Sequence, residues 1–185
     1  MATPEIRPYT LEELRGLVLA AKQHDDALRL TLYIWLALVG GLRQGEILRL
    51  TFLAALNTPE GIVVESTFSS RIVPRTPYAL RMLLRLRATL MGRGDELLFG
   101  DHGRPPHRGY IQTHWFHALG IEPMALRRTG ADLLHGAGSS LEEIAAHLGW
   151  RDLPPGFPAA PSPTPTRRRI EDTLQDLEQR LGFSL

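Results

Sequence analysis

Residues 25–40 form the most apolar stretch of the chain, and they constrain its fold more than any other segment. The large apolar side chains fall on most sides of the helix that this stretch predicts: Leu28, Leu30, Leu32, Ile34, Trp35, Leu36 and Leu38. A helix that is apolar all round has to be buried, so other elements must pack around it. The longest apolar run, Leu30 to Leu42, is too short and too interrupted to cross a bilayer. We therefore expect a core helix that ends at Gly40 and Gly41.

Shorter amphipathic segments on both sides of this helix predict its neighbours. Helical spacing of apolar residues indicates helices over 11–23, 43–50, 76–90, 109–118, 123–135, 140–148 and 167–181. β-Branched residues predict two paired strands, Ile62–Glu65 and Arg71–Pro74, to which residues near Leu53 would add a third. The expected fold class is α+β and mainly helical, with a small antiparallel sheet of two or three strands.

Proline divides the chain near its C-terminal end. Six of the twelve residues from 154 to 165 are proline, a composition that excludes helix and central strand. We expect a domain over 1–153, a proline-rich linker over 154–165 and a C-terminal helix within 166–185.

Positive charge gathers in the middle of the chain, although the net charge is only +1. Lys22 is the only lysine, so nearly all the positive charge is on arginine. Between Ser66 and Arg128, ten arginines stand against four acidic residues. A basic middle fits a polyanionic partner, because arginine makes forked contacts to phosphate. A coding sequence that favours arginine codons explains the same bias, and composition leaves both readings open.

Composition excludes several classes of protein and site. The chain has no cysteine, hence no disulfide, no thiolate zinc site and no cysteine nucleophile. No leader of charged and then apolar residues stands at the N-terminus, so we expect a cytoplasmic protein. His114 and His117 are spaced like a metal pair but have no third ligand at convincing spacing. We expect no metal and no cofactor.

Two segments place polar residues where a core would not need them. The first reads Gly-Leu-Arg-Gln-Gly-Glu-Ile over 41–47, and the second reads Leu-Arg-Arg-Thr over 126–129. The second is followed by Gly-Ser-Ser-Leu-Glu-Glu-Ile over 138–144 and by Leu-Gly-Trp over 148–150. With the predicted hairpin between them, this order resembles the catalytic domain of the tyrosine recombinases (phage integrases), from about residue 8 to 170.

The resemblance implies DNA recombination and integration as the process, double-stranded DNA as the partner and arginines as its ligands. In that family two arginines clamp the reacting phosphate; they correspond to Arg43 and Arg127. Trp150 takes a position where the family has His or Trp, and Glu46 would hold the first arginine in place. The expected DNA-phosphate ligands are Arg43, Arg71, Arg127, Arg128 and Trp150.

The departures from the family pattern concern the chemistry of cleavage. The histidine position is Met124, which has no proton to shuttle, and the lysine position falls at about Ser66. The position of the tyrosine nucleophile falls near Arg169, and no tyrosine follows Tyr110 in the chain. We therefore expect a pseudoenzyme that does not cleave DNA by the tyrosine mechanism.

Other interpretations remain open at this point. Arg43 with Glu46 also fits a surface ion pair, and Trp150 also fits a core plug. Besides a DNA-binding protein, the chain fits a protein-interaction module whose final helix docks onto a second copy, or a decaying integrase remnant. Only about ten residues precede the first helix, whereas family members carry a DNA-binding domain there. Weak contact without sequence specificity is therefore expected.

Overall fold

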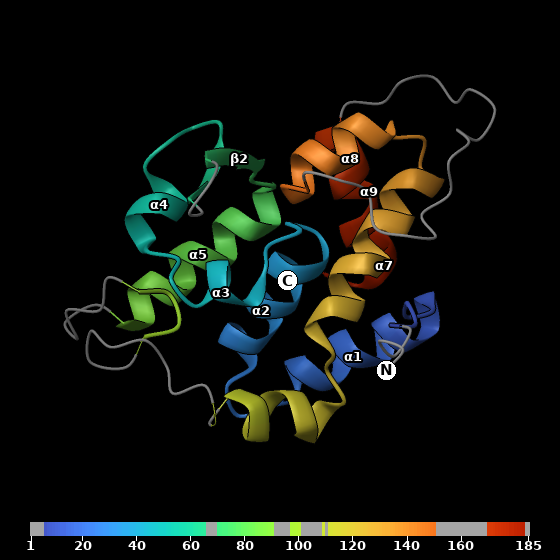
Figure 1. Cartoon of the computed structure of the whole chain (residues 1–185). Coiled ribbons are helices and arrows are strands. Elements are labelled where there is room, and N and C mark those ends of the chain that lie inside the picture. Colours follow the sequence, from blue (N-terminus) through green and yellow to red (C-terminus); the bar gives the residue numbers. More distant parts are fainter. Residues whose placement is uncertain are drawn as a thin grey trace.

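The structure is a computed structural model, and it describes residues 6–65, 70–90, 97–100, 109, 111–150 and 170–183. The elements in chain order are α1 (Leu11–Lys22), α2 (Ala27–Leu38), α3 (Gln44–Ile47), α4 (Phe52–Leu56), β1 (Gly61–Glu65), β2 (Ser70–Pro74), α5 (Pro77–Leu90), the π-helical segment η1 (Ile111–His117), α7 (Pro123–Gly136), α8 (Leu141–Leu148) and α9 (Ile170–Leu181) (Figure 1). Strands β1 and β2 pair antiparallel, from Gly61 opposite Pro74 to Glu65 opposite Ser70. The expected α+β, mainly helical fold class is confirmed.

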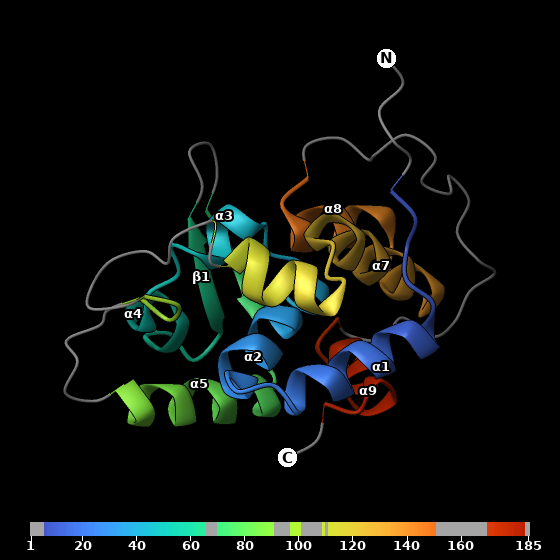
Figure 2. The same cartoon turned by 90° about the horizontal axis from the view of Figure 1, so that it is seen from below.

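Helix α2 lies at the centre of the fold, as its apolar surface predicts. Every residue from 30 to 38 is buried. Helices α1, α5 and α7 pack directly against it. In Figure 2, α2 lies between α5 on one side and α3, α7 and α8 on the other. None of the helices in the described ranges is long and apolar enough to cross a membrane.

The expectation of a third strand near Leu53 is wrong. Residues 52–56 form the short helix α4 instead, and Leu53 is 71% exposed on it. The hydroxyl of Thr51 accepts a hydrogen bond from the backbone N–H of Ala54 at 3.1 Å, which caps the helix. The Leu-Ala-Ala-Leu sequence that follows favours helix over strand. Among the described residues, the strand-type pairing next to α4 is one isolated bridge between Thr51 and Leu97.

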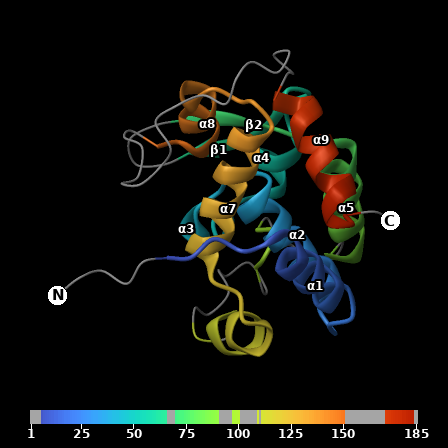
Figure 3. The ribbon, with the colours of Figure 1, turned by 90° about the vertical axis from the view of Figure 1, so that its right-hand side faces the viewer.

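Helix α9 packs into the same core as the rest of the chain. Its apolar stripe, Leu174, Leu177 and Leu181, is almost completely buried. The Phe183 ring then lies 5.6 Å from that of Tyr78 on α5. Helix α9 packs against α1 and α7, and Figure 3 shows α9 next to α1. The proline-rich linker expected over 154–165 lies outside the described residues.

A buried carboxylate also fastens α9 to this core. Glu178 is 5% exposed, and its Oε1 accepts hydrogen bonds from Trp35 Nε1 of α2 at 2.5 Å and from the hydroxyl of Thr76. Thr76 immediately precedes α5 and is itself buried. Burial raises the pKa of Glu178, although both hydrogen bonds oppose this effect. One oxygen atom therefore joins α2, α5 and α9.

Candidate functional site

The loop after α2 packs directly against the end of α8. Gly41 has a φ of 65°, in the left-handed region that glycine adopts without strain. A Cβ atom at this position would lie 2.2 Å from Cδ2 of Leu148. Both the left-handed backbone conformation and the close approach of α8 therefore favour glycine at position 41.

Helix α8 begins and ends with well-formed caps. Ser140 and Glu143 form the capping box that the sequence predicts. At the other end Gly149 has a φ of 63°, and the N–H of Trp150 donates to the carbonyl of Ala145 at 2.9 Å. The last carbonyls of a helix lack helical partners and carry its negative dipole end, so they attract cationic donors.

Three arginines donate hydrogen bonds to three successive carbonyls at this end of α8. The carbonyls of residues 147–149 accept, in turn, from Nε of Arg71 at 3.1 Å, from Nη2 of Arg127 and from Nη2 of Arg43 at 3.4 Å. The arginines come from β2, from α7 and from the residue before α3. We call these three side chains the arginine cluster. The end of α8 thus gathers guanidinium groups that lie far apart in the sequence.

Arg127 is the most deeply buried member of the cluster. It is only 4% exposed, and its Nε donates to the carbonyl of Gly41 at 2.7 Å. Its guanidinium also lies over the ring of Trp150, 5.4 Å from the ring centroid. Burial, followed by the positive charge of Arg43, lowers the pKa of Arg127 to about 10. Arg127 is therefore still charged at neutral pH. The carbonyl groups that hold it are dipoles and do not cancel its charge.

Glu46 is the carboxylate of the site, and its ion pair is with Arg71. Both carboxylate oxygens accept from the Arg71 guanidinium at 2.9 Å, and both side chains are about nine-tenths buried. Oε2 of Glu46 also accepts from the backbone N–H of Arg43 at 2.7 Å. Burial tends to raise the pKa of Glu46, but the hydrogen bonds from Arg71 and Arg43 lower it below its ordinary value. Glu46 thus contacts Arg43 through the backbone N–H of Arg43. The resemblance implied that Glu46 holds this arginine but not which atoms make the contact.

Of the other predicted residues, two lie on α7 away from the contacts of the cluster, and two lie outside the described ranges. Arg128 forms an ion pair with Asp132 one turn further along α7, at 3.4 Å. Met124 is 54% exposed in the first turn of the same helix. Ser66 and Arg169, at the predicted lysine and nucleophile positions, lie outside the described residues.

His147 belongs to the site, although its sequence position did not indicate it. It is 5% exposed, and its Nε2 lies 2.9 Å from the carbonyl oxygen of Val39 at the end of α2. Burial and the neighbouring Arg71 and Arg127 charges lower the pKa of His147 to about 4. The imidazole is therefore neutral, with Nε2–H as the donor to Val39. Its place on the buried stripe of α8, three residues after Ile144, is the signal that could have identified it.

Tyr9 ties the segment before α1 to the start of α7, and sequence reasoning missed this contact too. Its N–H donates to the hydroxyl of Thr129 at 2.8 Å. Its own hydroxyl donates to the carbonyl of Gly120 at 2.9 Å and accepts from the N–H of Glu122 at 2.8 Å. The helix that carries Arg127 is thus fixed at its start. No local sequence pattern marks a contact between positions 120 residues apart.

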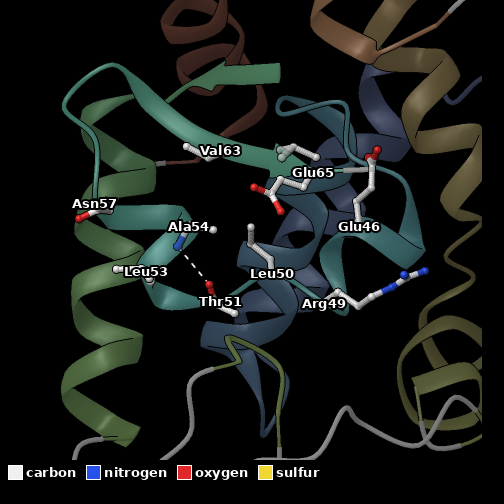
Figure 4. Close-up of a pocket in the computed structure, with 10 residues that line it drawn as sticks. Glu46, Arg49, Leu50, Thr51, Leu53, Ala54, Asn57, Val63 and Glu65 are labelled. Atoms are coloured by element: carbon white, nitrogen blue, oxygen red, sulfur yellow. Dashed lines mark hydrogen bonds between the residues drawn. The ribbon is translucent and has the colours of Figure 1, made fainter. Parts of the chain in front are cut away.

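A groove of about 520 Å³ lies beside the cluster, between α3, α4 and β1 (Figure 4). The side chain of Glu65 points into it, and Glu46 contributes a second carboxylate to its wall, whereas Arg49 reaches away. The Glu65 carboxylate that points into the groove makes it a poor place for a phosphate. Within the described ranges, no three His, Cys, Asp or Glu side chains are grouped as a metal site would need.

The chain was compared with known protein families, with curated proteins and with solved structures. No family model matches it, and no curated protein matches it. Several solved structures match. XerA recombinase superimposes with a TM-score of 0.65 at 22% identity, over 81% of this chain and 58% of its own.

Two structures of DNA complexes match to a similar extent. XerH site-specific recombinase, bound to its difH substrate before cleavage, gives a TM-score of 0.63 at 18% identity, over 80% of this chain and 48% of its own. A lambda integrase dimer bound to a COC′ core site gives 0.58 at 19% identity, over 82% and 58%. The chain thus spans between about half and three-fifths of the solved chains that it matches. It has the catalytic-domain-like fold of the tyrosine recombinases and integrases.

Proposed function

We propose that the protein binds duplex DNA of a recombination or integration system through the arginine cluster, and that it does not cleave DNA by the tyrosine mechanism. The observation that carries this proposal is the placement of Arg71, Arg127 and Arg43 on three successive carbonyls of α8. Two of these arginines, Arg43 and Arg127, are those that the sequence motifs single out.

The charges of the cluster suit a phosphate ligand. Three guanidinium groups and the single carboxylate of Glu46 leave an excess of positive charge. Carbonyl oxygens fix the direction of Arg127 and Arg43 without neutralising them, so their charge remains for an anion. Forked donors held in place before binding are effective phosphate ligands because they lose little freedom on contact. The nearby Trp150 ring supports the Arg127 guanidinium from one face.

The properties of the tyrosines support the second part of the proposal. A tyrosine nucleophile acts most readily when its hydroxyl loses its proton, yet the pKa values of Tyr9, Tyr33 and Tyr78 are all raised, chiefly by burial. The pKa of Tyr78 is raised to about 12. Tyr110 is the only other tyrosine in the chain and lies outside the described residues.

The missing proton donors point the same way. The chain has no lysine after Lys22, and Met124 stands one turn before Arg127 on α7. A thioether cannot protonate a leaving hydroxyl. Among its described residues, the site therefore keeps groups that suit a phosphate and has none of the proton donors that the family uses to break the ester bond.

The structural neighbours supply the class of nucleic acid. XerH recombinase is bound to its difH substrate and lambda integrase to a core site. We propose DNA as the ligand of this chain as well, because the arginine cluster of this chain lies within the same fold. Since the chain spans only about half of those proteins, binding by this part alone is expected to be weak and dependent on backbone phosphates.

Salt-dependent binding to a fluorescent duplex tests the DNA proposal. A phosphate-binding protein loses affinity as salt rises, with a log–log slope of about 0.9 per phosphate contact. Arg43→Ala should weaken binding to unrelated duplexes equally and reduce the slope by about one contact. Arg81→Ala, which removes an exposed arginine from α5, is the matched control and should bind as the wild type does. Absence of binding at low salt would contradict the proposal.

A suicide substrate tests the absence of cleavage. A nicked duplex traps the covalent intermediate of a tyrosine recombinase on the protein. We expect no protein–DNA adduct after denaturing electrophoresis, even at high protein concentration. An adduct that maps to any tyrosine would show that the argument from the nucleophile is wrong.

A further inference from the structure

His147 joins the end of α8 to the end of α2 at the point where the arginine cluster is assembled. We propose that His147 is the positioning residue of the cluster: its hydrogen bond to Val39 fixes the carbonyls that hold the side chains of Arg71 and Arg127 in place. This role rests on the proposed function for its purpose, but its geometry can be tested without DNA.

Arg127 donates to two backbone carbonyls. One is the carbonyl of Gly41, two residues after Val39, and the other is that of Leu148, the residue after His147. The Arg127 guanidinium therefore spans the seam between the two chain segments that His147 also bridges. Any change in the spacing of this seam alters both acceptors of Arg127 together.

Arg71 is linked to the same histidine. Its Nε donates to the carbonyl of His147 at 3.1 Å, while its guanidinium is held by Glu46. His147 thus makes two contacts: its side chain donates to Val39 at the end of α2, and its carbonyl accepts from Arg71 on β2. A single buried side chain sets the position of two arginines that come from different elements.

The chemical state of His147 fits a structural donor and not a ligand. It is 5% exposed and lies near two arginines, so the neutral imidazole is favoured. Only Nε2 has a hydrogen-bond partner among the described residues, whereas the buried Nδ1 has none. One N–H group therefore carries the contact. A glutamine side chain places an N–H at a similar reach, whereas leucine fills the space without a donor.

The experiment compares His147→Leu with His147→Gln. Thr76→Val is the matched control, since it removes a comparable buried hydrogen bond, to Glu178, in another part of the core. Hydrogen exchange of the arginine Nε–H groups, followed by NMR in the protein without DNA, reports directly on the bonds of Arg71 and Arg127. Duplex affinity at fixed salt is the second measurement.

We expect His147→Leu to speed exchange of both Nε–H groups and to weaken duplex binding by about fivefold, the effect of one net hydrogen bond. His147→Gln should restore both values, and Thr76→Val should lower thermal stability while leaving both unchanged. Unchanged Nε–H exchange in a folded His147→Leu protein would overturn the inference, as would equal acceleration in Thr76→Val. If Arg43→Ala also fails to affect DNA binding, the proposed function falls, and the exchange data still decide the role of His147.

Discussion

Glu178 provides a quantitative test of how α9 is attached. Glu178→Leu keeps most of the side-chain volume but removes the oxygen that accepts from Trp35 and Thr76. Both donors are buried, with exposures of 0% and 3%. An unsatisfied buried donor costs about 1–3 kcal/mol, and relief from burying a carboxylate offsets part of the sum. We expect a net loss of about 2–4 kcal/mol in the free energy of unfolding.

Thermal and urea unfolding measure this loss. For a chain of this size, about 2–4 kcal/mol corresponds to a Tm lower by roughly 5–15 °C. Glu178→Gln is the matched variant, because its Oε1 can accept both hydrogen bonds, and it should stay within about 1 kcal/mol of the wild type at neutral pH. The folded-state pKa of Glu178 is raised above the unfolded value. The wild type should therefore lose stability relative to Glu178→Gln as pH rises through that folded-state pKa.

Two results would refute this reasoning. Equal stability of Glu178→Leu and the wild type would mean that α9 is not fastened by this oxygen. Equal destabilisation of Glu178→Gln and Glu178→Leu would mean that the negative charge, and not the acceptor, matters. Light scattering on the same variants also tests the interpretation from the sequence that the final helix docks onto a second copy: a dimer that appears only in Glu178→Leu would show that α9 can leave its own core for a second copy.

Three further predictions concern the core and the cluster. Folding lowers the pKa of His147 from 6.5 to about 4. Between pH 4 and 6.5 the unfolded chain therefore binds more protons than the folded chain. Acid titration of unfolding should therefore cost the wild type up to about 3 kcal/mol as pH falls from 6.5 to 4, and His147→Gln should lack this loss. Gly130→Ala would bring a Cβ to 2.0 Å from the carbonyl oxygen of Leu38, so it should lower the free energy of unfolding by more than about 1 kcal/mol. A smaller loss would contradict that close packing. Glu46→Gln should destabilise the protein by about 3 kcal/mol, because the buried Arg71 loses its carboxylate, and denaturant unfolding measures this.

Much of the fold is readable from the sequence because its strongest patterns are local. The apolar surface of residues 30–38 places α2 at the centre, and the β-branched runs predict the hairpin. The segment at 52–56 is the exception. Its apolar residues fit a strand as well as a helix, and the cap at Thr51 that decides between them is a contact between one side chain and one N–H.

The candidate site was only partly predictable. Arg43 and Arg127 were recognisable because the motifs around them resemble a family. Their shared acceptors were not, because backbone carbonyls carry no sequence identity and the end of α8 lies about 100 residues from Arg43. His147 was missed for a similar reason: its partner, Val39, is another backbone oxygen. Arg71 was expected to face phosphate, and its ion pair with Glu46 required the folded geometry.

The most direct test of phosphate binding by the cluster compares two double variants of equal charge. Arg43→Ala/Arg127→Ala removes two cluster arginines, and Arg81→Ala/Arg85→Ala removes two exposed arginines of α5. Circular dichroism establishes folding, and Arg43→Ala alone serves where the buried Arg127 proves essential for it. Duplex affinity is then measured across a salt series. We predict that the cluster variant loses about two phosphate contacts from the salt slope while the α5 variant keeps the wild-type slope. Equal slopes for both double variants would contradict phosphate binding at this site.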